Sequence, residues 1–286
     1  MNNKKPRYNE VVFTKEQEEL IVELYTKNQL SSVKIGKQFD VSHKVIAKVL
    51  DKYNIPRIGN GRRKYQLNEH YFDKIDTPNK AYILGFLYAD GCNYRPKQTI
   101  SISLQEEDKC ILERMRKEIG SEKPLEFIDY SDKHDFGYTY KNQYRLLMFS
   151  SHMSDALNSL GVYENKSLKL IFPDWLDESL YSHFIRGVYD GDGSIYQSIK
   201  NENNHAVTIT ITSTDTFCRR LQEICKNKLN TNAGIYDASC HNGITKVFTL
   251  SGRNIAKTFL DWIYQDADMY LDRKYKRYLD YYNIAA

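Results

Sequence analysis

The sequence predicts an α+β protein in which one unit of helices and strands occurs twice, preceded by a small all-α region. A nine-residue pattern at 83–91, Ile-Leu-Gly-Phe-Leu-Tyr-Ala-Asp-Gly, returns at 185–193 as Ile-Arg-Gly-Val-Tyr-Asp-Gly-Asp-Gly. After each copy the apolar residues change from helical to alternating spacing, which is typical of half-buried strands. Residues 14–55 keep helical spacing throughout. These three observations together predict the fold class.

The all-α region, residues 1–55, is expected to contain three helices. Thr14 starts the first, and the second spans about 32–39. Ser42 can cap the third, because its hydroxyl can accept a hydrogen bond from a backbone N–H left unpaired at a helix start. The expected buried positions are Leu20, Ile21, Leu24 and Tyr25 in the first helix, Val33, Ile35 and Phe39 in the second, and Val45, Ile46, Val49 and Leu50 in the third.

This order is similar to a helix-turn-helix, with the small residue Gly36 in the second helix, a tight turn, and then a Ser-capped helix. In such a unit the third helix enters the major groove of DNA, and its exposed N-terminal residues meet base edges. The residues in those positions are His43, Lys44, Ala47 and Lys48. The alternative is a three-helix packing module with lysines on its solvated face.

Residues 56–77 are predicted to be a basic linker, since Pro and Gly stop the preceding helix. Its basic residues include Arg57, Arg62 and Arg63, which could contact phosphates. The alternative is that their charge serves only solubility. A short helix is expected at 68–76, leading into the repeated region.

Each copy of the repeated pattern carries two small residues four positions apart. They are Gly85 and Ala89 in the first copy, and Gly187 and Gly191 in the second. Residues four apart share one face of a helix, so the two helices could approach each other closely along these faces. Aligning the faces would bring Asp90 and Asp192 together. Gly91 and Gly193 would then end the helices in the left-handed conformation.

Two carboxylates at adjacent helix C-termini are electrostatically unfavourable, because each faces the negative end of a helix dipole and repels the other. Divalent cations would offset both penalties, and Mg²⁺ is the usual ion for oxygen ligands. A paired-metal site suits in-line attack on a phosphodiester. The alternative is that each Asp-Gly pair only turns a helix into a strand.

The two segments resemble the paired motifs of LAGLIDADG homing endonucleases, in the single-chain form. The resemblance covers about residues 78–282 and implies two halves, 78–175 and 176–286. It implies two pseudo-twofold-related αββαββα halves that form a DNA-binding saddle. The family often has Asp at the sixth motif position, where Asp190 stands in the second copy and Tyr88 departs from the pattern in the first. That position is variable and does not bear the chemistry.

The resemblance also implies the metal site. Asp90 and Asp192, each at the eighth motif position, would be the catalytic carboxylates, and the Mg²⁺ site would be formed by Asp90, Asp192, Gly91 and Gly193. Mn²⁺ is expected to be able to substitute for Mg²⁺.

The repeated order in both halves is helix, strand, strand, helix, strand, strand, helix. The strand that alternates Ile100, Ile102 and Leu104 with polar residues corresponds to the one with Val207, Ile209 and Ile211. The later strands are expected at 125–130 and 138–149 in the first half, and at 234–239 and 245–250 in the second. The helices after the motif are expected at 106–119, 154–160, 214–229 and 254–262.

The polar faces of these strands carry hydroxyl, amide and basic side chains, which can read base edges in a DNA groove. By the resemblance, the candidates in the first half are Arg95, Lys97, Ser101, Ser103, Tyr140 and Arg145. Those in the second half are Lys200, Thr208, Thr210, Thr212 and Lys246. The alternative is an ordinary solvated sheet.

A lysine-bearing stretch closes each half and supplies Lys166 and Lys274. A cation near the metal pair can stabilise charge that grows on the scissile phosphate. Family enzymes carry basic residues at the matching places, so we predict catalytic roles for both. The alternative is a solvated lysine at a helix end.

Composition excludes several other classes. The net charge of +4 is only mildly basic, and the five cysteines show no Cys-x-x-Cys pair of the kind found in zinc clusters. The seven histidines are scattered, without metal-ligand spacing. No signal sequence or long apolar run is present. We therefore expect an intracellular, cytoplasmic, reduced protein without membrane contact, in a bacterium or phage-infected host.

The expected function is a site-specific, metal-dependent endonuclease that acts as a monomer on a long asymmetric site in double-stranded DNA. Each half would cut one strand, leaving short 3′ overhangs and mobilising the encoding element. The chain starts with Met and lacks a terminal His-Asn, so a freestanding enzyme is expected rather than an intein. The alternatives are a non-cleaving transcription regulator or intron-RNA maturase on the same scaffold, and a protein-interaction module.

Overall fold

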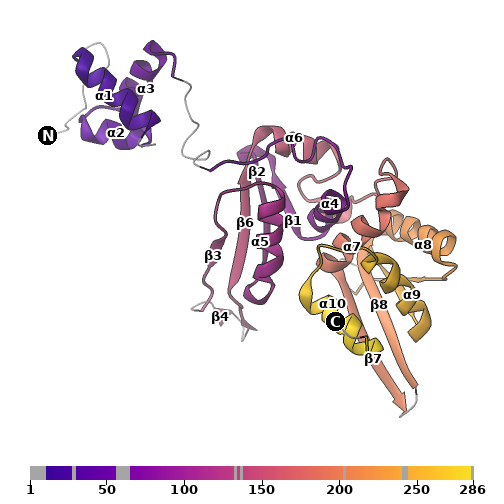
Figure 1. Cartoon of the computed structure of the whole chain (residues 1–286). Helices are drawn as coiled ribbons and strands as arrows, with labels where there is room; N and C mark the ends of the chain where they lie inside the picture. The colour runs from indigo at the N-terminus through magenta and orange to yellow at the C-terminus, as the bar shows by residue number, and fades with distance from the viewer. Residues whose placement is uncertain are drawn as a thin grey trace. The chain divides into compact units, whose positions relative to one another are not determined.

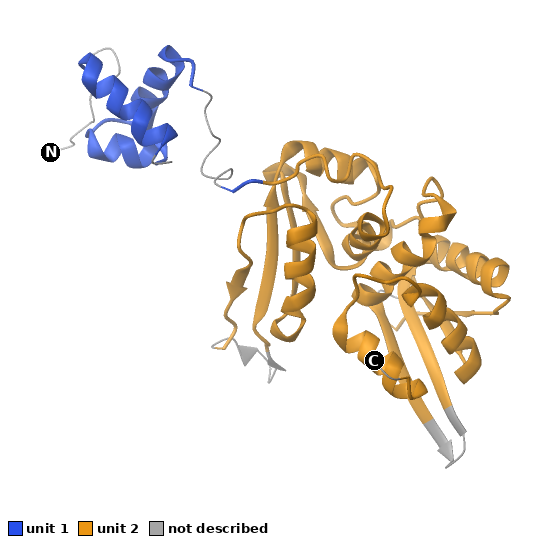
Figure 2. Ribbon diagram, viewed as in Figure 1, with its two compact units in different colours: residues 1–66 blue, residues 67–286 orange. Residues whose placement is uncertain are grey.

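The computed structural model describes residues 11–27, 30–55, 65–131, 134–135, 138–201, 204–239 and 244–284. The chain forms two compact units, residues 1–66 and 67–286 (Figure 2). The division between them falls within 56–77, and the finer four-part division stays a prediction. The linker candidates Arg57, Arg62 and Arg63 lie outside the described residues.

The first unit consists of α1 (Lys15–Thr26), α2 (Ser32–Gln38) and α3 (His43–Lys52). Thr14 and Gln17 form a reciprocal capping box at the start of α1. Ser42 occupies the N-cap position of α3, but its side chain makes no capping hydrogen bond. The core residues of the unit are Ile21, Tyr25, Ile35, Val41, Val45, Ile46, Val49 and Leu50.

Two of the predicted core positions were wrong. Leu20 is 46% exposed and Val33 is 51% exposed. A bundle of three short helices has neighbours on only one side of each helix, so it buries a narrower apolar stripe than the sequence pattern suggests. In α3, by contrast, all four residues expected in the core are buried.

Gly36 lets the chain fold back closely after α2. A Cβ at this position would lie 2.8 Å from the carbonyl oxygen of Val41 and 3.3 Å from the backbone nitrogen of His43. Asp40 turns the chain in the left-handed region, with φ of 51°. This tight turn leaves His43, Lys44 and Lys48 exposed on α3, whereas Ala47 is half-buried.

The first half of the second unit contains a four-stranded antiparallel sheet with strand order β1-β2-β6-β3. Its strands are β1 (Gly91–Tyr94), β2 (Thr99–Gln105), β3 (Glu126–Ile128) and β6 (Gln143–Phe149). Its helices are α4 (Pro78–Asp90), α5 (Lys109–Glu118) and α6 (Ser151–Ser159). A separate pair, β4 (His134–Asp135) and β5 (Tyr138–Thr139), forms a two-stranded ribbon.

The second half repeats this arrangement with strand order β7-β8-β10-β9. Its strands are β7 (Gly193–Asn201), β8 (Asn204–Thr214), β9 (Gly234–Asp237) and β10 (Thr245–Ser251). Its helices are α7 (Tyr181–Asp192), α8 (Asp215–Leu229), α9 (Arg253–Tyr264) and α10 (Asp272–Tyr282). The predicted α+β class is confirmed, with two αββαββα halves that follow three helices along the chain.

The centre of the second unit is the helix pair α4 and α7, which lie side by side between the two sheets (Figure 1). Thr77 starts α4 by accepting a hydrogen bond from the backbone N–H of Lys80, and Pro78 fits the first helical turn. One apolar core continues through both halves. Within the described part of the chain, no helix combines the length and apolar composition needed to cross a bilayer.

Two predicted elements differ from the structure, and one helix was missed. Residues 68–76 form turns and not a helix, because Asn68 accepts a hydrogen bond from the backbone N–H of His70 and so competes with helix formation. The strand predicted at 138–149 is interrupted before β6, where the Asn142 side chain accepts from the backbone N–H of Tyr130. Helix α10 was not predicted.

Helix α7 buries a basic pair. Arg186 is fully buried and donates to the carbonyl oxygens of Met269 at 2.9 Å and Ile263 at 2.7 Å. It also donates to Nδ1 of His183 at 2.9 Å, which requires a neutral imidazole. Burial, with a contribution from the Arg186 charge, lowers the pKa of His183 from 6.5 to about 4.

This shift predicts a pH dependence of stability. Between pH 6.5 and 4 the unfolded chain binds the His183 proton and the folded chain does not, so the free energy of unfolding falls as the pH falls through this window. The shift corresponds to about 3 kcal/mol. Denaturant titrations at pH 7 and 4 should show a loss larger by this amount in the wild type than in His183→Gln, which does not titrate. Equal losses in both proteins would contradict the prediction.

Candidate active site

The small residues of the repeated pattern lie where α4 and α7 meet. A Cβ on Gly85 would stand 2.0 Å from the carbonyl oxygen of Phe184, and one on Gly187 would stand 2.1 Å from that of Tyr82. A Cβ on Gly191 would stand 2.3 Å from the Cβ of Ala89. The backbones of the two helices are therefore in contact, and their C-terminal ends lie next to each other.

Asp90 and Asp192 are the last residues of α4 and α7. An oxygen of Asp90 lies 3.4 Å from the position that a Cβ on Gly191 would take, which places this carboxylate against the partner helix. Both aspartates keep exposed surface. Burial of its carboxylate, and next the negative charge of Asp90, raise the pKa of Asp192 to about 6. Burial also raises the pKa of Asp90. The site thus holds two acidic groups that resist joint ionisation.

The predicted left-handed conformation of Gly91 and Gly193 was wrong. Gly91 has φ −76° and ψ 148°, and Gly193 has φ −80° and ψ 158°, so both are extended residues that begin β1 and β7. Glycine is needed there for space. A Cβ would lie 2.6 Å from the carbonyl oxygen of Leu87 at the first position and 2.5 Å from that of Tyr189 at the second. The chain passes directly from helix to strand without the usual helix-ending turn.

Two buried lysines cap these helix ends. Lys166 donates to the carbonyl oxygens of Ala89 at 2.9 Å and Gly91 at 2.6 Å. Lys274 donates to those of Tyr189 at 2.6 Å and Asp190 at 2.8 Å, and it also reaches Gly191 and Gly193. Each ammonium satisfies carbonyls that a helix leaves unpaired and lies at the negative end of its dipole. The sequence indicated that the two carboxylates repel each other and the negative ends of the helix dipoles. Lys166 and Lys274 reduce this unfavourable energy.

The lysines also interact with the carboxylates. Burial lowers the pKa of Lys274 to about 8, although Asp190, Asp90 and Asp192 oppose the shift. Burial lowers the pKa of Lys166 as well, against the attraction of Asp192 and Asp90. Their ammonium groups are buried against backbone carbonyls, so both lysines hold the helix ends, and the catalytic roles expected for them stay a prediction.

The lysine cap predicts a stability effect. Lys274→Met keeps the chain length but removes the donor, leaving buried carbonyl oxygens unpaired, so the free energy of unfolding should fall by about 2–3 kcal/mol. Lys276→Met is the matched control, since Lys276 is exposed on the same helix and its loss should cost less than about 0.5 kcal/mol. Denaturant unfolding measures both. Equal stability of the two variants would show that the cap contributes nothing.

The sixth motif position connects the motif to the lysine-bearing segment in each half. Tyr88 donates its hydroxyl to the carbonyl oxygen of Leu160 at 2.5 Å, and Asp190 accepts from the backbone N–H of Leu271 at 2.8 Å. The Tyr82 hydroxyl also donates to Asp190, at 2.8 Å. Burial raises the pKa of Asp190 to about 6. The sequence pattern indicated no chemical role for this position, yet in both halves its side chain holds the segment that carries the lysine.

The predicted polar sheet face exists in both halves. Ser101 and Ser103 alternate with buried Ile100 and Ile102 along β2, and Arg145 donates to the hydroxyl of Ser103 at 3.0 Å. On β8, Thr210 and Thr212 are partly exposed. Thr208 is only 6% exposed and packs against Ser251, so its predicted surface position was wrong. Its hydroxyl lies 3.3 Å from that of Ser251, its neighbour across from it on β10.

The other candidates for DNA contact lie within the strands or next to them. Arg95 and Lys97 are in a short 3-10 helix (Arg95–Lys97), where Arg95 pairs with Asp155 at 2.6 Å. Lys246 on β10 pairs with Asp237. Tyr140 is partly exposed between β5 and β6, and Lys200 lies in β7 with its side chain outside the described part. None of these predicted contacts to DNA is tested by the fold alone.

Exposed tyrosines on the same sheet faces were missed by the sequence analysis. Tyr94 is 42% exposed on β1, and Tyr196 is 49% exposed on β7, where it follows buried Ile195. Tyr236 is 62% exposed on β9. The alternation of buried and exposed residues along β1 and β7 was the signal that could have located the first two. Aromatic rings on a polar surface are suited to contacts with sugars and bases.

The second half matches a known family. Residues 179–263, which include α7 and the whole second sheet, match the family described as LAGLIDADG-like domain. The match bears out, for this stretch, the LAGLIDADG resemblance predicted from the duplicated motif, and the matched residues contain Asp192 at the end of α7. The first half, with the same strand order, supplies Asp90 at the equivalent position.

Two curated relatives share part of their length with this chain. They are the ribonucleoside-diphosphate reductase NrdEB subunit alpha of Bacillus subtilis (strain 168) and the corresponding subunit of Bacillus phage SPbeta. Each is 25% identical over 181 residues, which cover 60% of this chain and 16% of the relative. The aligned region therefore spans about one sixth of the length of these relatives.

Solved structures with a similar arrangement include LAGLIDADG proteins bound to DNA. The meganuclease I-SmaMI bound to uncleaveable DNA is 13% identical, with a TM-score of 0.47, over 71% of this chain and 88% of that one. I-AabMI bound to uncleaved DNA is 15% identical, with a TM-score of 0.45, over 73% and 90%. The N-terminal LAGLIDADG domain of WhiA is 20% identical, with a TM-score of 0.41, over 68% and 89%. Likenesses of this extent do not define a function.

Proposed function

We propose that this chain is a metal-dependent DNA endonuclease that cuts both strands at a specific site, one strand in each half. The observation that carries the proposal is the placement of Asp90 and Asp192 at adjacent helix ends, where burial raises the pKa of both carboxyls and repulsion by Asp90 raises that of Asp192 further. A bound divalent cation would relieve that repulsion. The all-oxygen donor set fits Mg²⁺, with Mn²⁺ as a substitute.

The roles of the site residues follow from their contacts. Asp90 and Asp192 would hold the cation through their carboxylate oxygens. When bound, Mg²⁺ would lower the pKa of a water nucleophile and stabilise charge on the attacking and leaving oxygens. Lys166 and Lys274 hold the helix ends in place and keep positive charge near the reacting phosphate. The carbonyl oxygens of Gly91 and Gly193 already accept hydrogen bonds from these lysines, which makes the carboxylates the better metal ligands.

The two sheets would form the DNA-binding saddle. Their outward faces carry the hydroxyls of Ser101, Ser103, Thr210 and Thr212, the guanidinium of Arg145 and the exposed tyrosines. Hydroxyl and guanidinium groups can read base edges in the major groove. Because the two halves differ in sequence, the target is expected to be long and asymmetric. Both motif copies lie in one chain, so a monomer can supply both carboxylates of the site. The expected place of action is the cytoplasm of the host cell.

The first unit would extend the DNA contact through α3. On α3, which begins directly after the tight turn, His43, Lys44 and Lys48 are exposed. Deleting residues 1–66, which form a unit of their own, should shorten the footprint on DNA at one end and weaken binding, while the cut positions stay the same. Nuclease protection mapping measures this. An unchanged footprint would show that the unit does not bind the target.

The enzyme proposal is tested by incubating the protein with Mg²⁺ and its own coding locus from which the intron or insertion has been removed. Cleavage of both strands with short 3′ overhangs is expected. If neither strand is cut, the endonuclease proposal fails. Tight binding without cutting would instead support a non-cleaving regulator, and selective binding of intron RNA would support a maturase.

A further inference from the structure

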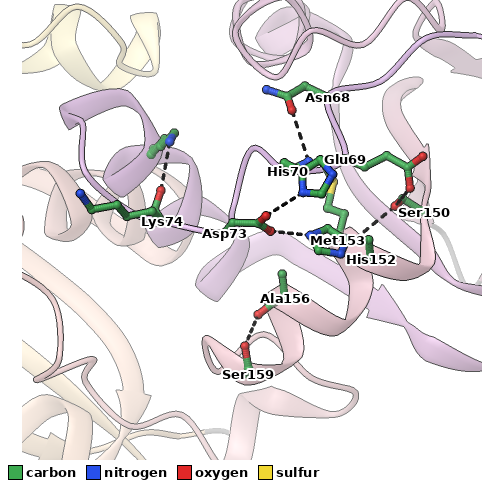
Figure 3. Close-up of polar contacts among 11 residues, drawn as sticks. Asn68, Glu69, His70, Asp73, Lys74, Ser150, His152, Met153, Ala156 and Ser159 are labelled. Carbon is green, nitrogen blue, oxygen red and sulfur yellow. Dashed lines mark hydrogen bonds and ion pairs between the residues drawn. The ribbon is translucent and has the colours of Figure 1, made fainter.

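A second cluster of potential metal ligands lies outside the paired aspartates. His70 and Asp73 belong to the turns that lead into α4, and His152 is in the first turn of α6. Figure 3 shows both imidazoles pointing at the Asp73 carboxylate. Nδ1 of His70 lies 2.7 Å from one carboxylate oxygen, and Nε2 of His152 lies 2.6 Å from the other. The two histidine rings are 4.3 Å apart.

We propose that His70, Asp73 and His152 form a binding site for a divalent transition-metal ion of the Zn²⁺ class. One potential ligand atom from each residue lies within 4.8 Å of the others. Tetrahedral zinc with Zn–N bonds of about 2.0–2.1 Å needs ligand atoms about 3.4 Å apart, so each imidazole must move away from Asp73, from the present N–O distances of 2.7 and 2.6 Å. The three side chains are exposed, so small side-chain rotations are sterically open to them.

The ligand types select the kind of metal. Two imidazole nitrogens with one carboxylate suit Zn²⁺, Cu²⁺ or Ni²⁺, whereas Mg²⁺ prefers oxygen ligands alone. This site therefore differs in chemistry from the paired aspartates, whose donors are all oxygen. Three protein ligands leave one tetrahedral position for water or an additional ligand.

The surrounding contacts already hold the two segments together. Ser150, the residue that caps α6, donates its hydroxyl to Glu69, next to His70 in the chain (Figure 3). The two oxygens of the Asp73 carboxylate lie within hydrogen-bonding distance of the two imidazoles, so Asp73 already links the two histidines. The metal would thus join the segment that enters the second unit to the helix that follows β6, and it should raise the thermal stability of the protein.

The test uses the full-length protein carrying Asp90→Asn and Asp192→Asn, so that zinc at the paired aspartates does not contribute and the result is independent of the endonuclease proposal. After treatment with a chelator, the protein is titrated with ZnCl₂ by calorimetry. One Zn²⁺ per chain is expected. Adding His152→Ala should weaken binding at least about 100-fold, because loss of a ligand should cost more than loss of its supporting contacts.

A matched control and a rescue complete the design. His43→Ala removes another exposed histidine, in the first unit, and should leave zinc binding unchanged. His152→Cys should retain the metal and, with Co²⁺ in place of zinc, add a thiolate charge-transfer band that the parent lacks. Absence of bound zinc, unchanged binding in His152→Ala, or a thiolate band in the parent would each overturn the proposal, the last because it would place the metal on a cysteine.

Discussion

Replacing Asp90 or Asp192 by asparagine is expected to abolish double-strand cleavage while DNA binding persists. Asparagine keeps the shape of the side chain but removes the charge that would hold the cation at the helix ends. Metal stabilisation of phosphodiester hydrolysis contributes several kcal/mol, and about 4 kcal/mol corresponds to roughly a thousand-fold in rate. Binding should be unchanged or tighter, since a negative charge beside the DNA backbone is lost. Cleavage assays and filter binding on the same target separate the two quantities.

Asp280→Asn provides the control for this prediction, because Asp280 is an exposed carboxylate on α10. It should cut at the wild-type rate. If either active-site variant lost binding and cleavage together, the aspartates would be structural and the metal site would have to be abandoned. A variant that nicks a single strand would show that the two halves act independently.

The repeated motif predicted the centre of the fold because its information is local. Small residues four apart define a helix face whatever surrounds it, and two copies in one chain require a partner for each face. Gly85 and Gly187 meet the backbone of the opposite helix, and Asp90 and Asp192 follow at the helix ends. The alternation of apolar and polar residues predicted the strands after each motif for the same reason.

What could not be predicted depends on residues far apart in the chain. His70 and His152 show no metal-ligand spacing, since the fold alone brings their rings to 4.3 Å. From the sequence, the exchange of Asp for Tyr at the sixth motif position indicated only a variable position without a chemical role. The structure shows that Tyr88 and Asp190 each fix the segment before a capping lysine, one as a donor and the other as an acceptor. A pattern of residue types does not reveal such equivalence.

The second large effect is expected at the helix crossing. Gly85→Ala would place a methyl group 2.0 Å from the carbonyl oxygen of Phe184, and the obstacle is backbone that cannot rotate away. Overpacking in a core costs about 1–3 kcal/mol where side chains can move, so a backbone clash between two central helices should exceed about 3 kcal/mol. Denaturant unfolding of soluble protein measures this loss. Cleavage should also fall, because moving the helices apart separates Asp90 from Asp192.

Ala89→Gly makes the opposite change on the same helix and the same face. It removes a Cβ next to Gly191 without creating a clash, so it should cost only about 1 kcal/mol, the usual penalty for glycine inside a helix. The contrast between these two variants isolates steric contact from helix propensity. A Gly85→Ala protein within about 1 kcal/mol of the wild type would mean that the helices can separate freely. In that case the paired carboxylates would have no fixed distance, and a shared metal site between them could not be maintained.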